Sequence, residues 1–130
     1  MKGFMFIALL LLLNSIPVYA RWEAIEKQYQ PPGLEILYFD PETIHHEGTR
    51  ATLWQLTDLK WNSTTRFLSL KTHKEFDCEQ ARVRVLQVIE FSRHMGTGRS
   101  ASGYIESGNW QRVEMHTVNH TLWKAACGKR

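Results

Sequence analysis

Apolar and polar residues alternate with period two over several stretches of the chain, a pattern typical of β-strands that bury one face. In residues 49–58, period two places Thr52, Trp54 and Leu56 on one face of a predicted strand. Ala51, Leu53 and Gln55 are on the other face. The same alternation predicts further strands at residues 34–40, 66–78 and 81–92. The pattern therefore predicts a β-sheet as the main element of the fold.

The strand predicted at residues 66–78 has an apolar face and a polar face. Its apolar face carries Leu68, Leu70, Phe76 and Cys78, and its polar face carries Lys71, His73, Glu75 and Asp77. Period two therefore places Cys78 on the side that faces the core.

The strand predicted at residues 81–92 is apolar on more than one side. One predicted face carries Val83, Val85, Ile89 and Phe91. The other is dominated by Arg82, Arg84 and Glu90, but it also holds Leu86 and Val88. We therefore expect other parts of the protein to cover the middle of this strand on both faces.

The remaining N-terminal and connecting segments predict shorter elements. Residues 22–29 could form a first strand or an amphipathic turn, and the Pro-Pro-Gly sequence that ends at Gly33 breaks it. Proline suits the first position of a helix, so Pro41–Ile44 predicts one helical turn, followed by a turn at residues 45–48. Residues 100–106 predict an edge strand.

The periodicity becomes helical near the C-terminus, at residues 115–126. At 100° per residue, one arc of this helix carries Met115, Val118, Leu122, Ala125 and Ala126. Gly128, a residue type that commonly ends helices, follows Cys127. The sequence thus predicts an α+β fold in which a terminal helix docks on the sheet.

Residues 1–20 have the features of a secretory signal peptide. Lys2 gives a positive start, an apolar run spans residues 4–13, and Val18-Tyr19-Ala20 is an acceptable cleavage site. We expect a mature domain of residues 21–130 that begins near Arg21 and carries no lipid; the alternative is an uncleaved N-terminal anchor. About 110 residues are enough for one domain.

The charge of the mature chain argues against nucleic acid as a partner. Removing Lys2 with the signal leaves 15 basic residues against 13 acidic residues, a net charge of +2, and the two signs are interspersed. No second long apolar span follows the signal. We therefore expect a soluble mature protein without stable membrane insertion.

The mature chain has two cysteines, Cys78 and Cys127. In an exported protein an even number of cysteines predicts a disulfide, which here would join the helix to the sheet. The rival interpretation is a metal-binding pair, although the spacing matches no zinc pattern.

The chain resembles the surface-adhesin protein E family of exported proteobacterial proteins. The most specific features are Phe76-Asp77-Cys78, the following Arg82-Val83-Arg84-Val85-Leu86, and Met95-Gly96-Thr97-Gly98. Tyr38-Phe39-Asp40-Pro41, Leu53-Trp54-Gln55-Leu56, Trp110 and Cys127 complete the resemblance. It covers most of residues 21–127.

The resemblance implies an antiparallel sheet, about five to six strands here, with a C-terminal helix held by a disulfide. The adhesin that names the family binds host matrix proteins and haem and can dimerise, so the resemblance leaves a dimer open for this chain. That adhesin is a lipoprotein, whereas this chain has no lipid-anchor cysteine after its signal.

A glycine-rich loop near residues 93–103 is the first candidate binding site. Its glycines permit positive φ and expose backbone amides, and Arg93, His94 and Arg99 add positive charge, so an anionic group could bind there. The alternative is a hairpin loop that needs glycine for its shape.

His116 and His120 are four residues apart, so a helix would place both on one side. That spacing could hold a haem or a metal, but a third ligand is not evident, and a polar helix flank is the simpler interpretation. His45-His46-Glu47 does not match the zinc motif His-Glu-x-x-His.

The sequence favours a binding protein over an enzyme. Neither a nucleophile motif nor a carboxylate pair is evident, and both cysteines are assigned to the disulfide. Five tryptophans are more than one small core needs, and Trp61 and Trp110 lie beside polar loops. Exposed aromatic residues beside arginine often anchor protein interfaces, although they could also be half-buried covers of the sheet.

These features together predict an exported, non-enzymatic α+β binding module that acts in the periplasm or at the cell surface and has a protein partner. The candidate partner-binding residues are Arg93, His94, Arg99, Trp61 and Trp110. The alternatives are a periplasmic carrier of haem or metal, with His116 and His120 as ligands, and a purely structural envelope protein.

Overall fold

The structure, a computed structural model, describes residues 21–31, 33, 35–60, 66–102 and 108–129. Its strands are β1 (Glu23–Ala24), β2 (Glu35–Glu47), β3 (Arg50–Leu59), β4 (Ser69–Asp77), β5 (Arg82–Phe91), β6 (Ser100–Ser102) and β7 (Gln111–Arg112). The helices are α2 (Val118–Cys127) and two short 3₁₀ helices, η1 (Lys27–Tyr29) and η2 (His94–Gly96). The predicted signal peptide, Trp61 and positions 103–106 of the predicted edge strand lie outside the described residues.

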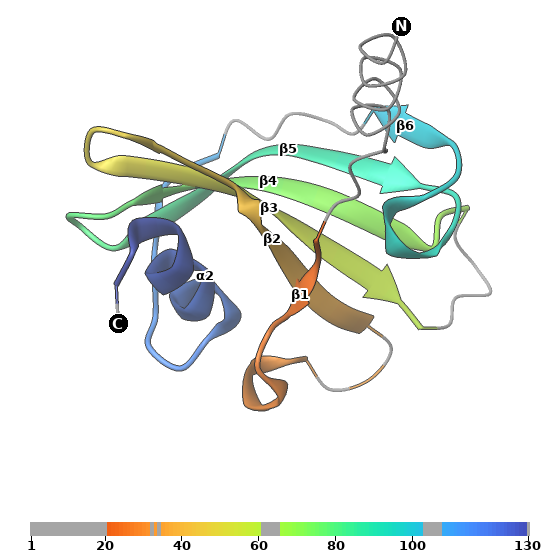
Figure 1. Cartoon of the computed structure of the whole chain (residues 1–130), viewed down its shortest axis with the longest axis horizontal. Coiled ribbons are helices and arrows are strands. Elements are labelled where there is room, and N and C mark those ends of the chain that lie inside the picture. The colour runs from red at the N-terminus through yellow and green to blue at the C-terminus, as the bar shows by residue number, and fades with distance from the viewer. Residues whose placement is uncertain (1–20, 32, 34, 61–65, 103–107, 130) are drawn as a thin grey trace, which may run out of the picture.

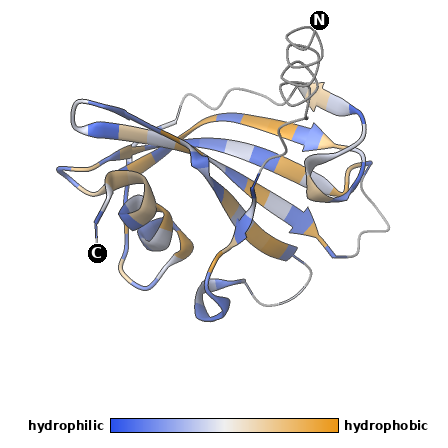
Figure 2. Ribbon diagram, viewed as in Figure 1, coloured by the Kyte–Doolittle hydropathy of each residue, from blue (hydrophilic) through white to orange (hydrophobic). Residues whose placement is uncertain are grey.

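The strands form one antiparallel sheet in the order β1-β2-β3-β4-β5-β6, and β7 pairs with the beginning of β5. Helix α2 lies against one side of this sheet (Figure 1). The predicted α+β fold is confirmed, with seven strands instead of five to six. Hydrophobic and hydrophilic residues alternate along the long strands, as the period-two pattern predicts (Figure 2).

The turn predicted at residues 45–48 lies later in the chain, because β2 extends to Glu47 and only Gly48 of that range is in the turn before β3. The helical turn predicted at Pro41–Ile44 is wrong, because β2 continues through this segment. The segment is a bulge, since the pairing with β3 moves from Asp40 opposite Trp54 directly to His45 opposite Thr52. The Thr43 hydroxyl donates a hydrogen bond to the Asp40 carbonyl and accepts one from the Trp54 amide. These bonds hold the extra residues against the sheet, so proline starts a bulge here and not a helix.

A second bulge changes the predicted faces of β5. His73 pairs with Gln87 whereas Lys74 pairs with Val85, so β5 contains one extra residue at this point. Period two is broken there, and Ile89 and Phe91 lie on the face opposite Val83 and Val85. The prediction that all four share a face is therefore wrong.

Helix α2 begins at Val118, three residues later than predicted. The Thr117 side chain caps the helix by accepting a hydrogen bond from the His120 amide, at 3.2 Å. Met115 is therefore outside the helix and 67% exposed. The predicted C-terminal glycine is confirmed, because Gly128 has φ +66° at the helix end.

The main core lies between the sheet and α2. It is formed by apolar side chains from the N-terminal segment, the long strands and the helix, namely Ile25, Leu37, Phe39, Ala51, Leu53, Phe76, Val83, Val113, Leu122 and Ala126. Phe76, Leu53 and Leu122 are fully buried. The two residues of α2 that are buried, Leu122 and Ala126, belong to the arc that the sequence predicts to face the sheet.

Two links fix α2 to the end of β4. Cys78 and Cys127 form the predicted disulfide, with their Cα atoms 5.5 Å apart. The indole nitrogen of Trp123 donates a hydrogen bond of 3.0 Å to the Asp77 carbonyl. The last turn of the helix is therefore attached to Cys78, directly after β4, and the middle of the helix is attached to Asp77, the last residue of β4.

A lysine lies between the sheet and the start of the helix. The Lys74 amine donates hydrogen bonds to the side-chain oxygens of Gln55, at 2.6 Å, and Asn119, at 2.8 Å. Both partners are neutral amides, and Lys74 forms no ion pair with any residue that the structure describes. Burial lowers the pKa of Lys74 from 10.5 to about 8.

The stability of the protein should therefore rise as the pH increases from about 8 to about 10.5, the interval between the folded and unfolded pKa values of Lys74. In this interval the unfolded state binds more protons, so one such group adds at most about 1.4 kcal/mol per pH unit. Urea unfolding of the wild type and of Lys74→Met at several pH values measures the contribution. A Lys74→Met variant with the same pH slope as the wild type would contradict the assignment.

No helix within the described ranges is long and apolar enough to cross a membrane.

Candidate functional site

The side of the sheet opposite α2, here called the helix-free face because α2 does not cover it, carries a mixture of charged and aromatic side chains. The strand register places the following side chains there: Asp40, Thr52, Trp54, Lys71, His73, Glu75, Arg82, Arg84, Ile89 and Phe91. Trp22, just before β1, adds an indole ring that contacts Lys71. This face is therefore the candidate functional site.

Ion pairs order one end of the helix-free face. Arg82 binds Asp77 at 2.8 Å, and Arg84 binds Glu75 at 2.7 Å through Nε. The Trp110 ring lies over both guanidinium groups, with Arg84 at 4.5 Å and Arg82 at 5.0 Å from its centroid. The hydrogen bond from Arg82, helped by the backbone amides of Gln80 and Glu79, lowers the pKa of Asp77.

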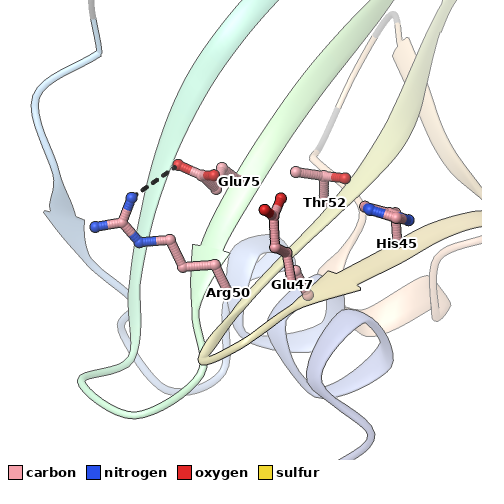
Figure 3. A pocket seen from close by; sticks show the side chains of 6 residues that line it. His45, Glu47, Arg50, Thr52 and Glu75 are labelled. Carbon is pink, nitrogen blue, oxygen red and sulfur yellow. Dashed lines mark ion pairs between the residues drawn. The ribbon is translucent and has the colours of Figure 1, made fainter.

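A polar cavity of about 310 Å³ lies next to these ion pairs, under the β2–β3 hairpin. It is lined by His45, Glu47, Arg50, Ala51, Thr52 and Glu75. Figure 3 shows Arg50 paired with Glu75, a contact of 4.0 Å, while the exposed Glu47 carboxylate lies on the same side of the strands. Among the described residues, no three His, Cys, Asp or Glu side chains are arranged to hold a metal ion.

An aromatic pocket of about 210 Å³ lies further along the helix-free face. It is lined by Trp22, Asp40, Thr43, Trp54, Lys71, Ile89 and Phe91. The Lys71 ammonium group lies 5.4 Å from the centroid of the Trp22 ring and 5.0 Å from that of Phe91. Mostly apolar walls with a few convergent polar groups are typical of small-ligand sites.

A stacked pair of rings separates the aromatic pocket from the polar cavity. Trp54 and His73 are opposite each other on β3 and β4, with ring centroids 4.5 Å apart and an interplanar angle of 8°. Burial lowers the pKa of His73, and the nearby Glu75 opposes this effect. The pair is therefore a flat, largely uncharged surface at neutral pH.

The glycine-rich loop folds back onto the same face instead of projecting from it. The amides of Met95 and Gly96 donate to the side chains of Asp58 and Ser69, each at 2.8 Å, so these two amides are engaged within the chain. A Cβ on Gly96 would lie 2.7 Å from Lys71 Cε, and Gly96 has φ +67°. The shape of the loop therefore requires glycine at this position.

The predicted partner-binding residues are divided between two places. His94 pairs with Asp58 at 3.2 Å, and Arg93 and Arg99 are exposed in the loop that follows β5. Arg99 also lines a cavity of about 430 Å³ beside β5 and β6. Trp110 lies beside the first half of β5, on the arginines, and the position of Trp61 is not described.

The aromatic pocket was not predicted from the sequence. Lys71 carried a usable signal, because period two places it on the polar face of its strand, and Trp54 is placed by the same period on the face opposite Leu53. Phe91 gave the opposite signal, since the bulge in β5 reverses its face. Trp22 joins the site through the pairing of β1 with β2, and Asp40 joins it through the pairing of β2 with β3.

The arrangement predicted for His116 and His120 is wrong. His116 precedes the helix and has φ +63°, because the helix is capped at Thr117. His120 lies within α2 and stacks on Trp123, with ring centroids 5.9 Å apart. The two histidines therefore do not share one side of a helix.

Comparison with known proteins identifies a family and solved structures with a similar fold. The family model described as surface-adhesin protein E matches residues 22–128. A structure of protein E from Haemophilus influenzae is similar with a TM-score of 0.66 and 13% identity, covering 86% of this chain and 87% of that chain. Crystal form II of the same protein gives a TM-score of 0.60 and 12% identity, covering 88% and 97%. No curated protein sequence matches the chain.

Proposed function

The chain belongs to the surface-adhesin protein E family, and on this premise we propose that it is an exported, non-enzymatic module that binds another protein through its helix-free face. The family model covers almost the whole of the predicted mature domain, and the structural similarity supports the same fold. An adhesin-like surface protein needs an exposed surface for its partner, and this chain offers two sheet faces of different character.

The observation that carries the proposal is the composition of the helix-free face. Tryptophan and arginine are the residue types most enriched at the energetic centres of protein interfaces. Here Trp22 and Trp54 lie on the same face as Arg82 and Arg84, and all four are partly exposed. On the other face of the sheet, α2 and the N-terminal segment pack on the core, and the disulfide holds α2 in place. A partner can therefore reach the side chains of the helix-free face, whereas α2 shields side chains on the other face.

We expect the purified domain to bind one or more proteins from a panel of immobilised extracellular matrix proteins. Trp22→Ala and Lys71→Ala should each weaken this binding about tenfold or more, because residues at the centre of an interface contribute at least about 1–2 kcal/mol. Biolayer interferometry on each variant measures the effect.

Two changes on the helix side serve as matched controls. Met115→Ala removes an exposed apolar side chain, and Lys124→Ala removes one positive charge from α2. Both should leave the affinity unchanged. Equal losses in the two pairs of variants, or no capture by any matrix protein, would contradict the proposal.

A further inference from the structure

We propose that the aromatic pocket binds one neutral hexopyranose ring, so that the partner is recognised in part through a glycan. This inference rests on the proposed function only in placing the sugar on a partner protein. The pocket itself is defined by Trp22, Asp40, Trp54, Lys71 and Phe91.

Asp40 is a buried carboxylate that faces this pocket, and it forms no ion pair with any of the residues that the structure describes. Its residue is only 4% exposed, and the register with Trp54 places its side chain on the helix-free face. From the described residues the carboxylate accepts one hydrogen bond, donated by the Glu42 amide at 2.9 Å. Buried carboxylates in proteins are normally paired or fully hydrogen-bonded. Asp40 therefore has acceptor capacity left for a donor that enters the pocket.

Lys71 supplies the complementary donor and determines the charge of the ligand. Its ammonium group contacts the rings of Trp22 and Phe91 and forms no ion pair within the described part of the chain. A second cation in the same pocket would be attracted to Asp40 but repelled by this ammonium group, which disfavours a quaternary ammonium ligand. An anion would be attracted to Lys71 but repelled by Asp40. The pair favours a neutral ligand that both donates and accepts hydrogen bonds.

A sugar ring meets these requirements together. Its hydroxyl groups can donate to a carboxylate and accept from an ammonium group, and its C–H faces pack on the electron-rich faces of aromatic rings. The pocket, at about 210 Å³, is smaller than the roughly 300 Å³ at which sites for drug-sized ligands begin. It therefore suits one ring and is too small for a porphyrin, and no histidine is among its described lining residues.

The test uses the methyl glycosides of glucose, galactose and N-acetylglucosamine as probes, with the folded domain and saturation-transfer NMR. At least one glycoside should bind weakly. Asp40→Asn, which keeps the acceptor for Glu42, and Lys71→Met, which keeps the aliphatic stem, should each reduce this binding at least tenfold. Glu114→Gln and Lys124→Met, which make the same chemical changes outside the pocket, should not.

Failure of all three glycosides to bind the wild type would overturn the inference, as would binding that survives in both pocket variants. Preferential binding of free leucine would also overturn it, because a zwitterion would then be the ligand of Asp40 and Lys71. The proposed function can be tested separately. Capture of matrix protein without glycoside binding would contradict the sugar site and support the protein interface. Glycoside binding without capture would support the sugar site and contradict the protein interface.

Discussion

Replacing Cys127 with serine should lower the free energy of unfolding by about 2–4 kcal/mol, because the disulfide closes a loop between residues 49 positions apart. The loss should appear first in α2. A helix of 10 residues is marginal alone in water, and this one depends on its contacts with the sheet. Urea unfolding gives the free energy, and hydrogen exchange of the backbone amides gives the order in which elements open.

The double variant Cys78→Ser/Cys127→Ser is the matched control, because it removes the same bond without leaving a free thiol. Both variants should show faster exchange in α2 while β3 and β4 stay protected. Equal loosening of the sheet and the helix would contradict the view that the disulfide acts mainly on the helix.

Phe76→Ala should destabilise the protein by about 3–5 kcal/mol, the usual cost of removing a buried phenylalanine ring. Phe76 is 0% exposed and packs in the core beneath α2. Phe91→Ala is the matched comparison on the helix-free face, where the ring is only partly buried and contacts Lys71. It should cost clearly less stability, because part of the Phe91 ring is already in contact with water.

The two phenylalanines therefore separate stability from binding. Phe76→Ala should lower the stability and leave the affinity of the folded fraction intact, whereas Phe91→Ala should mainly impair binding at the aromatic pocket. Chemical unfolding and binding measurements on both variants decide this. Equal destabilisation by the two substitutions would mean that the helix-free face is a second core.

The sequence predicted the long strands and the disulfide because these depend on local signals. Period two at Leu53 and Trp54 reflects burial of one face, and two cysteines in an exported chain leave one intramolecular pairing. The two bulges could not be predicted in this way. They depend on bonds between strands, such as that from the Trp54 amide to Thr43, which the sequence pattern does not contain.

Two features were accessible from the sequence and were not used. Period two places Lys74 on the same face as Phe76, which predicts a lysine beneath the helix. Thr117 is a preferred capping residue, so a helix start at Val118 was a reasonable alternative to Met115. The aromatic pocket combines residues that are far apart in the sequence, from Trp22 to Phe91, and the strand order of the sheet brings them together.

Hydroxyl-radical footprinting of the domain, with and without a captured matrix protein, tests the central claim most directly. If the partner binds the helix-free face, oxidation of Trp22, Trp54 and Phe91 should fall on binding. Oxidation of Met115, which is 67% exposed in the turn before α2, should stay the same. Protection of Met115 with unchanged oxidation of Trp22 and Trp54 would place the partner on the helix side and contradict the proposed function.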